Sequence, residues 1–179
     1  MPGIHSEASA VADPPLMSQR YAQIARLGSV HEARLAGLLC SLDVPSRVNR
    51  FGHPASNACV QAYAKRAICA ATFVAGALVE GTLIGVVEVF EASRDGTAEM
   101  AFAVAADWRR QGVASALLEA AMRWAEHSGI GTLRMVISRN NWPMRGFAHE
   151  TGAQLDFDNL NEIFADIAVA TAAALDIAA

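Results

Sequence analysis

The sequence lacks the features that define several large classes of protein. It has no excess of basic residues, because 14 lysines and arginines face 18 aspartates and glutamates and the net charge is −4. A nucleic-acid partner, which usually requires a basic face, is therefore not expected. No apolar run approaches the ~20 residues needed to cross a bilayer, and residues 1–17 lack the basic and apolar blocks of a secretory signal. Neither secretion nor a membrane partner is expected.

Cysteine is also scarce. Cys40, Cys59 and Cys69 are odd in number, and no pair of them has a C-x-x-C spacing. They fit reduced thiols in a cytoplasmic protein and give no reason to expect a disulfide framework or a bound metal. None stands beside a plausible base, which argues against a nucleophilic cysteine.

The length of the chain, 179 residues, suits one domain with a sizeable core. Residues 1–18 are rich in alanine, serine and proline and are expected to form a flexible N-terminal tail. A single domain is expected over 19–169, without an internal repeat or linker. The last residues, 170–179, are expected to be an alanine-rich C-terminal tail.

Local patterns in the first part of the domain predict one strand followed by helices. Ser29 and Glu32 fit a capping box at the start of the first helix. Asn57 is the expected cap of a later helix. The expected elements are a strand over 19–27, a helix over 30–42, a short helical turn over 45–51 and a helix over 58–67.

The periodicity then changes to that of strands. Three consecutive strands joined by short turns are expected to form an antiparallel meander. A helix, a strand, a helix capped by Asn141 and two closing strands follow. The expected spans are 69–79, 83–91 and 97–105 for the meander, then 113–127, 132–138, 142–151, 154–157 and 162–169.

The third strand of the meander has one unusual face. Glu99, Ala101, Ala103 and Ala105 alternate onto that face, so a single carboxylate is followed only by methyl groups. Such a face leaves room for a ligand to lie along the strand. The alternative is that the alanines accept a closely packed helix and that Glu99 points to solvent.

The turn after this strand carries Arg109, Arg110 and Gly112, and a helix follows it. Glycine permits a close approach of the backbone to a ligand, and helix N-termini attract anions. Together these features predict a cradle suited to a pyrophosphate. The turn has neither the P-loop pattern nor G-x-G-x-x-G. Two solvated arginines at a helix start are the alternative interpretation.

Two motifs in this region resemble those of the GNAT superfamily of acyl-CoA-dependent N-acyltransferases. The pattern Q/R-x-x-G-x-G/A is present as Arg109-Arg-Gln-Gly112-Val-Ala114. A strand and then Asn141-Trp-Pro-Met144 follow about thirty residues later, with the helix ending at Gly152. The resemblance implies an α/β (α+β) fold with a mixed, mostly antiparallel sheet of about six or seven strands flanked by about four helices.

A narrower resemblance concerns the bacterial protein lysine acetyltransferases. Ala98-Glu99-Met-Ala-Phe102 is similar to the strand that carries their general base, and the segment 46–51 is similar to their S-R-x-x-R-F pattern. The resemblance implies that Glu99 takes a proton from the amine. The alternative is that Glu99 only attracts a cationic acceptor.

The resemblance also implies the cosubstrate and its contacts. Acetyl-CoA would lie with its pyrophosphate on the turn and its pantetheine arm along the strand, while a backbone amide near Val104 polarises the thioester carbonyl. The amine acceptor would be a protein lysine or a small amine, and the family often forms homodimers. The implied cofactor-binding residues are Phe102, Ala103, Val104, Arg109, Arg110, Gln111, Gly112, Val113, Ala114 and Asn141.

One position departs from the family. Many members have a tyrosine in the helix before Gly152 that protonates the leaving thiolate, and Ala148 stands there in this chain. His149 is adjacent but points about 100° away around the helix. Water is the alternative proton source. A non-catalytic acyl-CoA-binding regulatory module is the alternative function.

Overall fold

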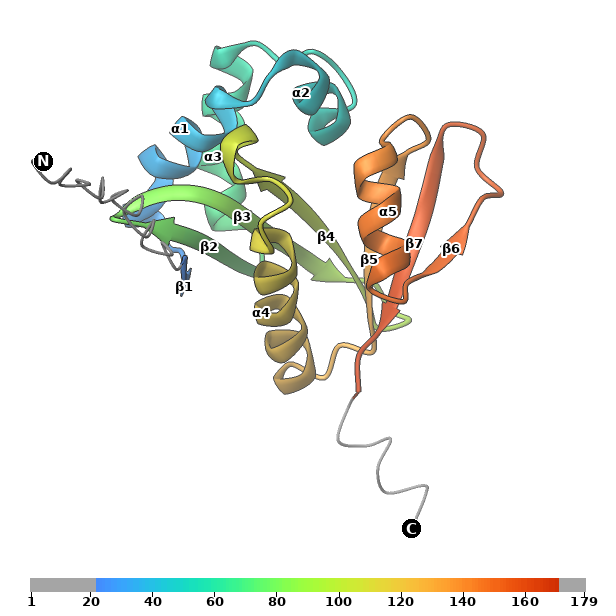
Figure 1. Cartoon of the computed structure of the whole chain (residues 1–179). Helices are drawn as coiled ribbons and strands as arrows, with labels where there is room; N and C mark the ends of the chain where they lie inside the picture. The colour runs from blue at the N-terminus through green and yellow to red at the C-terminus, as the bar shows by residue number, and fades with distance from the viewer. Residues whose placement is uncertain (1–21, 171–179) are drawn as a thin grey trace, which may run out of the picture.

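A computed structural model describes residues 22–170 (Figure 1). The predicted tail over 1–18, and all but the first residue of the predicted tail over 170–179, lie outside the described residues. Its centre is a seven-stranded sheet in the order β1-β2-β3-β4-β5-β7-β6, in which only β4 and β5 are parallel neighbours. The strands are β1 (Gln23–Arg26), β2 (Phe73–Val79), β3 (Thr82–Ala92), β4 (Thr97–Val104), β5 (Thr132–Ser138), β6 (Gln154–Asp156) and β7 (Glu162–Ala168). The predicted meander is β2-β3-β4, and its antiparallel pairing is confirmed.

Helices cover both faces of the sheet (Figure 1). One layer comprises α1 (Glu32–Ser41), α2 (Val44–Phe51) and α3 (Asn57–Ala70), and the opposite face carries α4 (Val113–His127) and α5 (Trp142–Glu150). The described chain therefore has five α-helices, where about four were expected. Among residues 22–170, no helix is long and apolar enough to cross a membrane.

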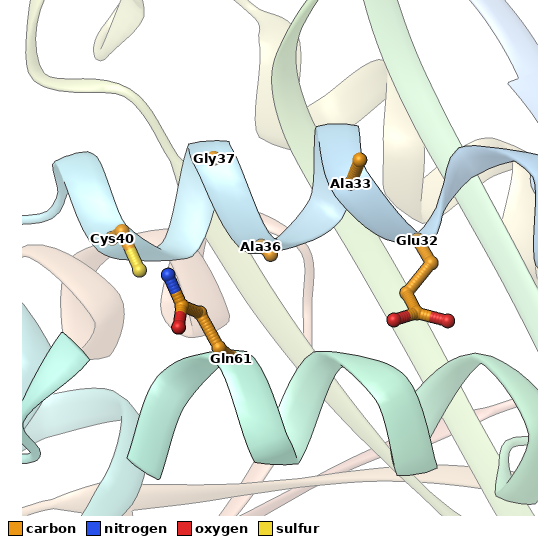
Figure 2. A pocket seen from close by; sticks show the side chains of 6 residues that line it. All are labelled: Glu32, Ala33, Ala36, Gly37, Cys40 and Gln61. Atoms are coloured by element: carbon orange, nitrogen blue, oxygen red, sulfur yellow. The ribbon is translucent and has the colours of Figure 1, made fainter. Parts of the chain in front are cut away.

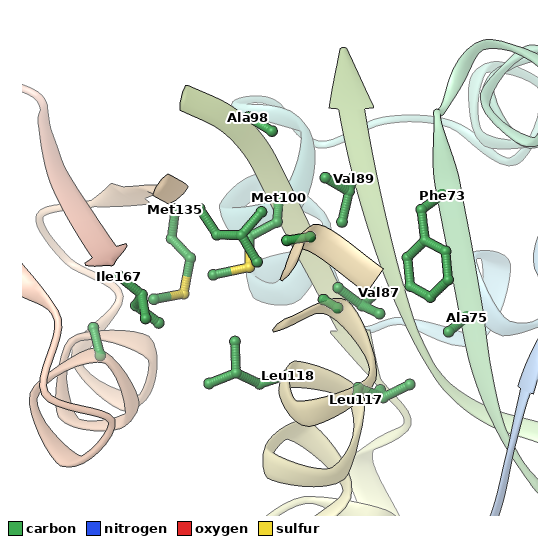
Figure 3. Close-up of a cluster of buried hydrophobic side chains, with 14 of the residues drawn as sticks. Phe73, Ala75, Val87, Val89, Ala98, Met100, Leu117, Leu118, Met135 and Ile167 are labelled. Atoms are coloured by element: carbon green, nitrogen blue, oxygen red, sulfur yellow. The ribbon is translucent and has the colours of Figure 1, made fainter. Parts of the chain in front are cut away.

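The larger core lies between the sheet and α4 (Figure 3). Met100 of β4 and Met135 of β5 meet there in register, and both are almost completely buried. Leu117 and Leu118 of α4 pack onto them and their neighbours. This core holds β4 and β5 together along the paired part of the two strands.

The second core lies under α1 and α3, and it includes one alanine of the unusual β4 face. Ala103 is 6% exposed and packs in this cluster with Val86, Leu35 and Val60. The small residue at this position therefore accepts the helix layer, as in the alternative interpretation. Glu99, on the same face but nearer the start of β4, is exposed.

Two predicted helix caps are wrong by one or two residues. A 3₁₀ turn over Ser29–His31 precedes α1, and the backbone N–H of Gly28 donates to Nδ1 of His31 at 3.1 Å instead of the predicted Ser29–Glu32 capping box. Ser56, not Asn57, caps α3, because its hydroxyl accepts from the backbone N–H of Cys59 at 3.3 Å. By contrast, the predicted bounds of α4 and β5 are those observed.

Gly85 allows α4 to lie close to β3. A Cβ atom at this position would stand 2.8 Å from Cγ1 of Val113 and 3.2 Å from Cδ1 of Leu117. Val113 is the first residue of α4. The missing side chain thus sets how near the start of α4 comes to the sheet.

Candidate active site

The site begins where β4 and β5 separate. The two strands pair only over Thr97–Met100 and Thr132–Met135, although β4 continues to Val104 and β5 to Ser138. Beyond that point they diverge, with α2 on one side of the opening and α5 on the other (Figure 1). Phe102 of β4 and Phe147 of α5 meet edge to face, with 5.8 Å between ring centroids.

Backbone groups of β4 face this opening. The N–H of Ala105 donates to the carbonyl of Ile84 on β3 at 2.9 Å. Because backbone groups alternate sides along a strand, those of Phe102 and Val104 point the other way, toward β5. They form a strand edge that β5 does not pair with, where an extended ligand can add like a short strand.

The turn before α4 has the backbone geometry of an anion site. Arg110 and Gly112 adopt left-handed conformations, with φ of 59° and 77°. A non-glycine residue in this region is strained, and such strain clusters at ligand sites. The side-chain amide of Gln111 donates to the carbonyl of Asp107 at 2.6 Å and closes the turn.

The first turn of α4 keeps its backbone donors available. Gly112 is the N-cap residue and has no side chain with which to accept them. The N–H groups of the first helical turn have no partner within the helix. They carry the positive end of the helix dipole, next to the exposed side chain of Arg110. The arrangement fits a phosphate or pyrophosphate group.

The side chain of Arg109 is directed elsewhere. Its Nε donates to the carbonyl of Val104 at 3.1 Å, and its other two nitrogens reach α2, at 3.3 Å from Oδ2 of Asp43 and 3.0 Å from Oγ of Ser46. Hydrogen bonds from the Ser46 side chain and backbone, and then the charge of Arg109, hold the pKa of Asp43 below its usual value. Sequence patterns gave no sign of this contact.

Glu99 stands one residue before the last paired position of β4, at the start of the opening. The Glu99 side chain is exposed, so the alanines on the same face of β4 do not enclose it. Its register partner on β5 is Arg134, whose guanidinium donates twice to Asp166 of β7, at 2.7 and 2.6 Å. Within the described residues, the Glu99 carboxylate has no hydrogen-bond or ion-pair partner.

A second carboxylate near Glu99 is buried, and sequence reasoning missed it. Glu88 of β3 is 0% exposed and is ion-paired to Arg50 of α2, while the hydroxyl of Tyr63 on α3 donates to it at 3.2 Å. Arg50 also bonds to Tyr63, and its own Nε is buried without a partner among the described residues. Burial raises the pKa of Tyr63 to about 12. The available signal was one acidic residue inside the apolar run 86–90.

The register places both carboxylates on one face. Glu88 pairs with Ala101, so Glu88 and Glu99 are diagonal neighbours on adjacent strands. Burial lowers the pKa of Arg50, but the charges of Glu88 and Tyr63 and the hydrogen bonds to both residues together outweigh this effect, so the pKa is raised. The buried pair anchors α2 to the face that carries Glu99.

The far side of the opening is formed by α5. Asn141 caps this helix as predicted, because its Oδ1 accepts from the backbone N–H of Met144 at 3.3 Å. Ala148 is completely buried, and His149 is exposed. Neither Ala148 nor a neighbouring residue of α5 presents a phenol to the opening.

A shallow hollow between α1 and α3 is separate from this site (Figure 2). Cys40 and Gln61 lie toward each other across it, and Glu32 stands near one end. Its lining includes no residue of β4, of the turn or of α4. It adds no group to the chemistry of the opening.

Solved structures with similar folds include several acetyltransferases. The GNAT domain of Streptomyces lividans PAT matches with a TM-score of 0.72 and 21% identity, over 82% of this chain and 90% of that one. PaiA N-acetyltransferase from Thermoplasma acidophilum, solved with coenzyme A, matches with a TM-score of 0.66 and 15% identity, over 82% and 98%. Salmonella typhimurium YncA, solved with acetyl-CoA, gives 0.65 and 13%, over 83% and 94%.

The sequence itself matches a family. A search of curated proteins finds no significant match. The model of the acetyltransferase (GNAT) family matches residues 39–153, more than half of the chain, including β4, the turn, α4 and α5. The similar structures share the fold, a mixed and mostly antiparallel sheet with helices on both faces. The chain therefore belongs to the GNAT family of N-acetyltransferases.

Proposed function

We propose that this acetyltransferase moves an acetyl group from acetyl-CoA to a primary amine by direct attack in a ternary complex. The observation that carries the proposal is the separation of β4 from β5 beside the uncapped start of α4. An unpaired strand edge and an anion cradle then lie next to each other. A carboxylate, Glu99, stands where the two strands part.

The residues present fit acetyl-CoA as the first substrate. The amides of the turn and of the first helical positions, from Arg110 through Gly112 to Ala114, suit the pyrophosphate, and the side chain of Arg110 adds charge. Gln111 supports the turn from inside. The pantetheine arm would lie along the β4 edge at Phe102, Ala103 and Val104. The side-chain amide of Asn141 would donate to this arm while its oxygen caps α5.

The chemistry proposed for the opening uses the backbone N–H of Val104, the carboxylate of Glu99 and a water molecule. The N–H of Val104 faces the gap and would donate to the thioester oxygen as negative charge develops there. The amine nitrogen attacks the carbonyl carbon, the carbon–sulfur bond breaks, and sulfur leaves with the electron pair. Glu99 accepts the proton lost by the amine. Because Ala148 is buried and carries no acid, water returns a proton to the thiolate, whose conjugate thiol has a pKa near ~8.5.

We favour a protein lysine as the acceptor over a small free amine. Glu99 is exposed, so an amine on a flexible stem can reach it from solvent. The neighbouring wall is α2, which presents Val44 and Val48 to solvent at 63% and 37% exposure. An exposed apolar surface on this wall suits the residues that flank a lysine in a polypeptide.

Two measurements test the proposal in order. Calorimetric titration with CoA comes first, and absence of binding at millimolar CoA would contradict the cofactor assignment. Release of CoA from acetyl-CoA is then measured with a panel of small amines and lysine peptides. Binding without transfer to any amine would instead support the regulatory module, and transfer to small amines alone would contradict the lysine assignment.

A further inference from the structure

The guanidinium of Arg109 joins three elements that meet at the opening. Arg109 belongs to the turn before α4, at the end of a 3₁₀ turn over Ala106–Trp108. Its side chain holds the carbonyl of Val104 at the end of β4, and it holds Asp43 and Ser46 at the start of α2. Asp43 and Arg109 are 66 residues apart in sequence. One side chain therefore connects the proposed cofactor turn to a helix of the opposite layer.

Helix α2, which Arg109 contacts, lies over the face of the sheet that carries Glu99. At the other end of α2, Arg50 reaches Glu88, the diagonal neighbour of Glu99. Arg47, in the middle, fastens α2 to the carbonyls of Cys40, Leu42 and Ala55. These other contacts attach α2 to its own layer and to β3. Arg109 is the side chain that attaches it to the turn.

We propose that Arg109 is a positioning residue that couples occupancy of the acetyl-CoA turn to the placement of α2, the wall beside Glu99. This inference rests on the proposed function, because it takes the turn to be the cofactor site. It assigns the side chain of Arg109 to α2 instead of to the phosphates. Arg110, whose side chain is exposed beside the helix N-terminus, keeps the phosphate-facing role.

The coupling has a simple physical basis. An anion bound to the amides of the turn and of α4 restricts the turn, and the backbone of Arg109 is part of that turn. Because the guanidinium of Arg109 also contacts Asp43, the conformational freedom of α2 decreases when the anion binds. The effect is reciprocal, because a fixed α2 must favour the anion by the same factor. The ion pair is partly exposed, at 38% for Arg109 and 48% for Asp43, so we expect an effect of about two- to fivefold.

The N-cap position offers a variant that isolates the contact. Asp43 has two roles, since Oδ1 accepts from the backbone N–H of Ser46 at 2.8 Å while Oδ2 meets Arg109. Asparagine caps helices as well as aspartate does, so Asp43→Asn keeps the cap and removes the charge pair. Arg109→Gln removes the same pair from the other side. Glu119→Gln, which breaks an exposed ion pair with Arg123 within α4, is the control for loss of a carboxylate charge.

The test is amide hydrogen exchange of α2, with and without saturating CoA as the probe. In the unmodified protein and in Glu119→Gln, CoA should slow exchange over 47–51 by about two- to fivefold. In Asp43→Asn and Arg109→Gln this slowing should be absent, although CoA still binds Asp43→Asn with a Kd within about fivefold of the original. In transfer assays with a lysine peptide, both variants should raise the KM of the peptide more than that of acetyl-CoA.

Three results would count against the coupling. One is CoA binding to the unmodified protein without any change in α2. Another is slowing that persists in Asp43→Asn. The third is an Arg109→Gln variant in which only the KM of acetyl-CoA changes, which would return the side chain to the phosphates. Absence of CoA binding to the unmodified protein would instead remove the proposed function on which the inference rests.

Discussion

Arg50 of α2 and Glu88 of β3 form an ion pair whose carboxylate is completely inaccessible to solvent. Removal of one partner leaves the other charge buried and uncompensated, which typically costs about 3–5 kcal/mol. Glu88→Gln should therefore lower the free energy of unfolding by about 3 kcal/mol in urea titrations. The double variant Arg50→Met/Glu88→Leu should cost less than Glu88→Gln, since no charge remains. Equal stability of Glu88→Gln and the unmodified protein would contradict the pair.

Tyr63 gives the protein a specific response to alkaline pH. Its pKa in the folded protein is about 12, against 10.0 for the free side chain. Because the folded pKa is raised, the contribution to stability is complete below about pH 10 and is lost as pH rises toward about 12. The chain has two tyrosines, so the tyrosinate absorbance of the protein minus that of Tyr63→Phe isolates this titration. A difference curve centred at the free value would disprove the assignment.

Gly85 allows the first residues of α4, which form the proposed anion site, to lie close to the sheet. In Gly85→Ala the new methyl group would overlap Val113, 2.8 Å away, at the first residue of α4. Overpacking of this kind costs about 1–3 kcal/mol, and we expect weaker CoA binding in calorimetry as well. Gly37→Ala is the control, because nothing lies within 4 Å of the new atom and the site is inside α1. It should raise stability by up to about 1 kcal/mol and leave CoA binding unchanged.

Asp166 pairs with the guanidinium of Arg134, the register partner of Glu99. Both residues of the Arg134–Asp166 pair are partly exposed, at 38% and 31%, so Asp166→Asn should change stability by less than about 1 kcal/mol. It would free the guanidinium to turn toward Glu99, its register partner. A base held in an ion pair accepts a proton less readily, so kcat/KM at neutral pH should fall by about two- to tenfold. Adding Arg134→Gln should restore the rate, and a double variant as slow as the single one would contradict this role.

The part of the fold from β4 to α5 was predictable from sequence because its signals are local. Alternation along 97–105, a helical period over 113–127 and a capping asparagine at 141 each arise from neighbouring residues. The caps of α1 and α3 were misplaced because several side chains that can accept a hydrogen bond stand within a few residues. Local chemistry alone does not select between Ser56 and Asn57.

The contacts that organise the site could not be predicted in the same way. Arg50 and Glu88 are 38 residues apart, and Arg109 and Asp43 are 66 apart. These contacts depend on how the helices pack on the sheet. The hydrophobic periodicity of the sequence does not predict that packing. The sequence motif predicted a phosphate role for Arg109, whereas the structure directs its side chain to α2. The family motif identifies the turn, but it does not reveal the contact between the Arg109 side chain and α2.

The role of Glu99 as the base in amine acetylation can be measured by the rate of CoA release from acetyl-CoA with a lysine peptide. The rate is compared between the unmodified protein, Glu99→Gln and the control Glu119→Gln. We predict that Glu99→Gln lowers kcat by about 100- to 10,000-fold and removes the acid limb of the pH profile, with CoA affinity unchanged. Glu119→Gln should behave like the unmodified protein. A Glu99→Gln variant with undiminished kcat and the same pH profile would contradict the claim.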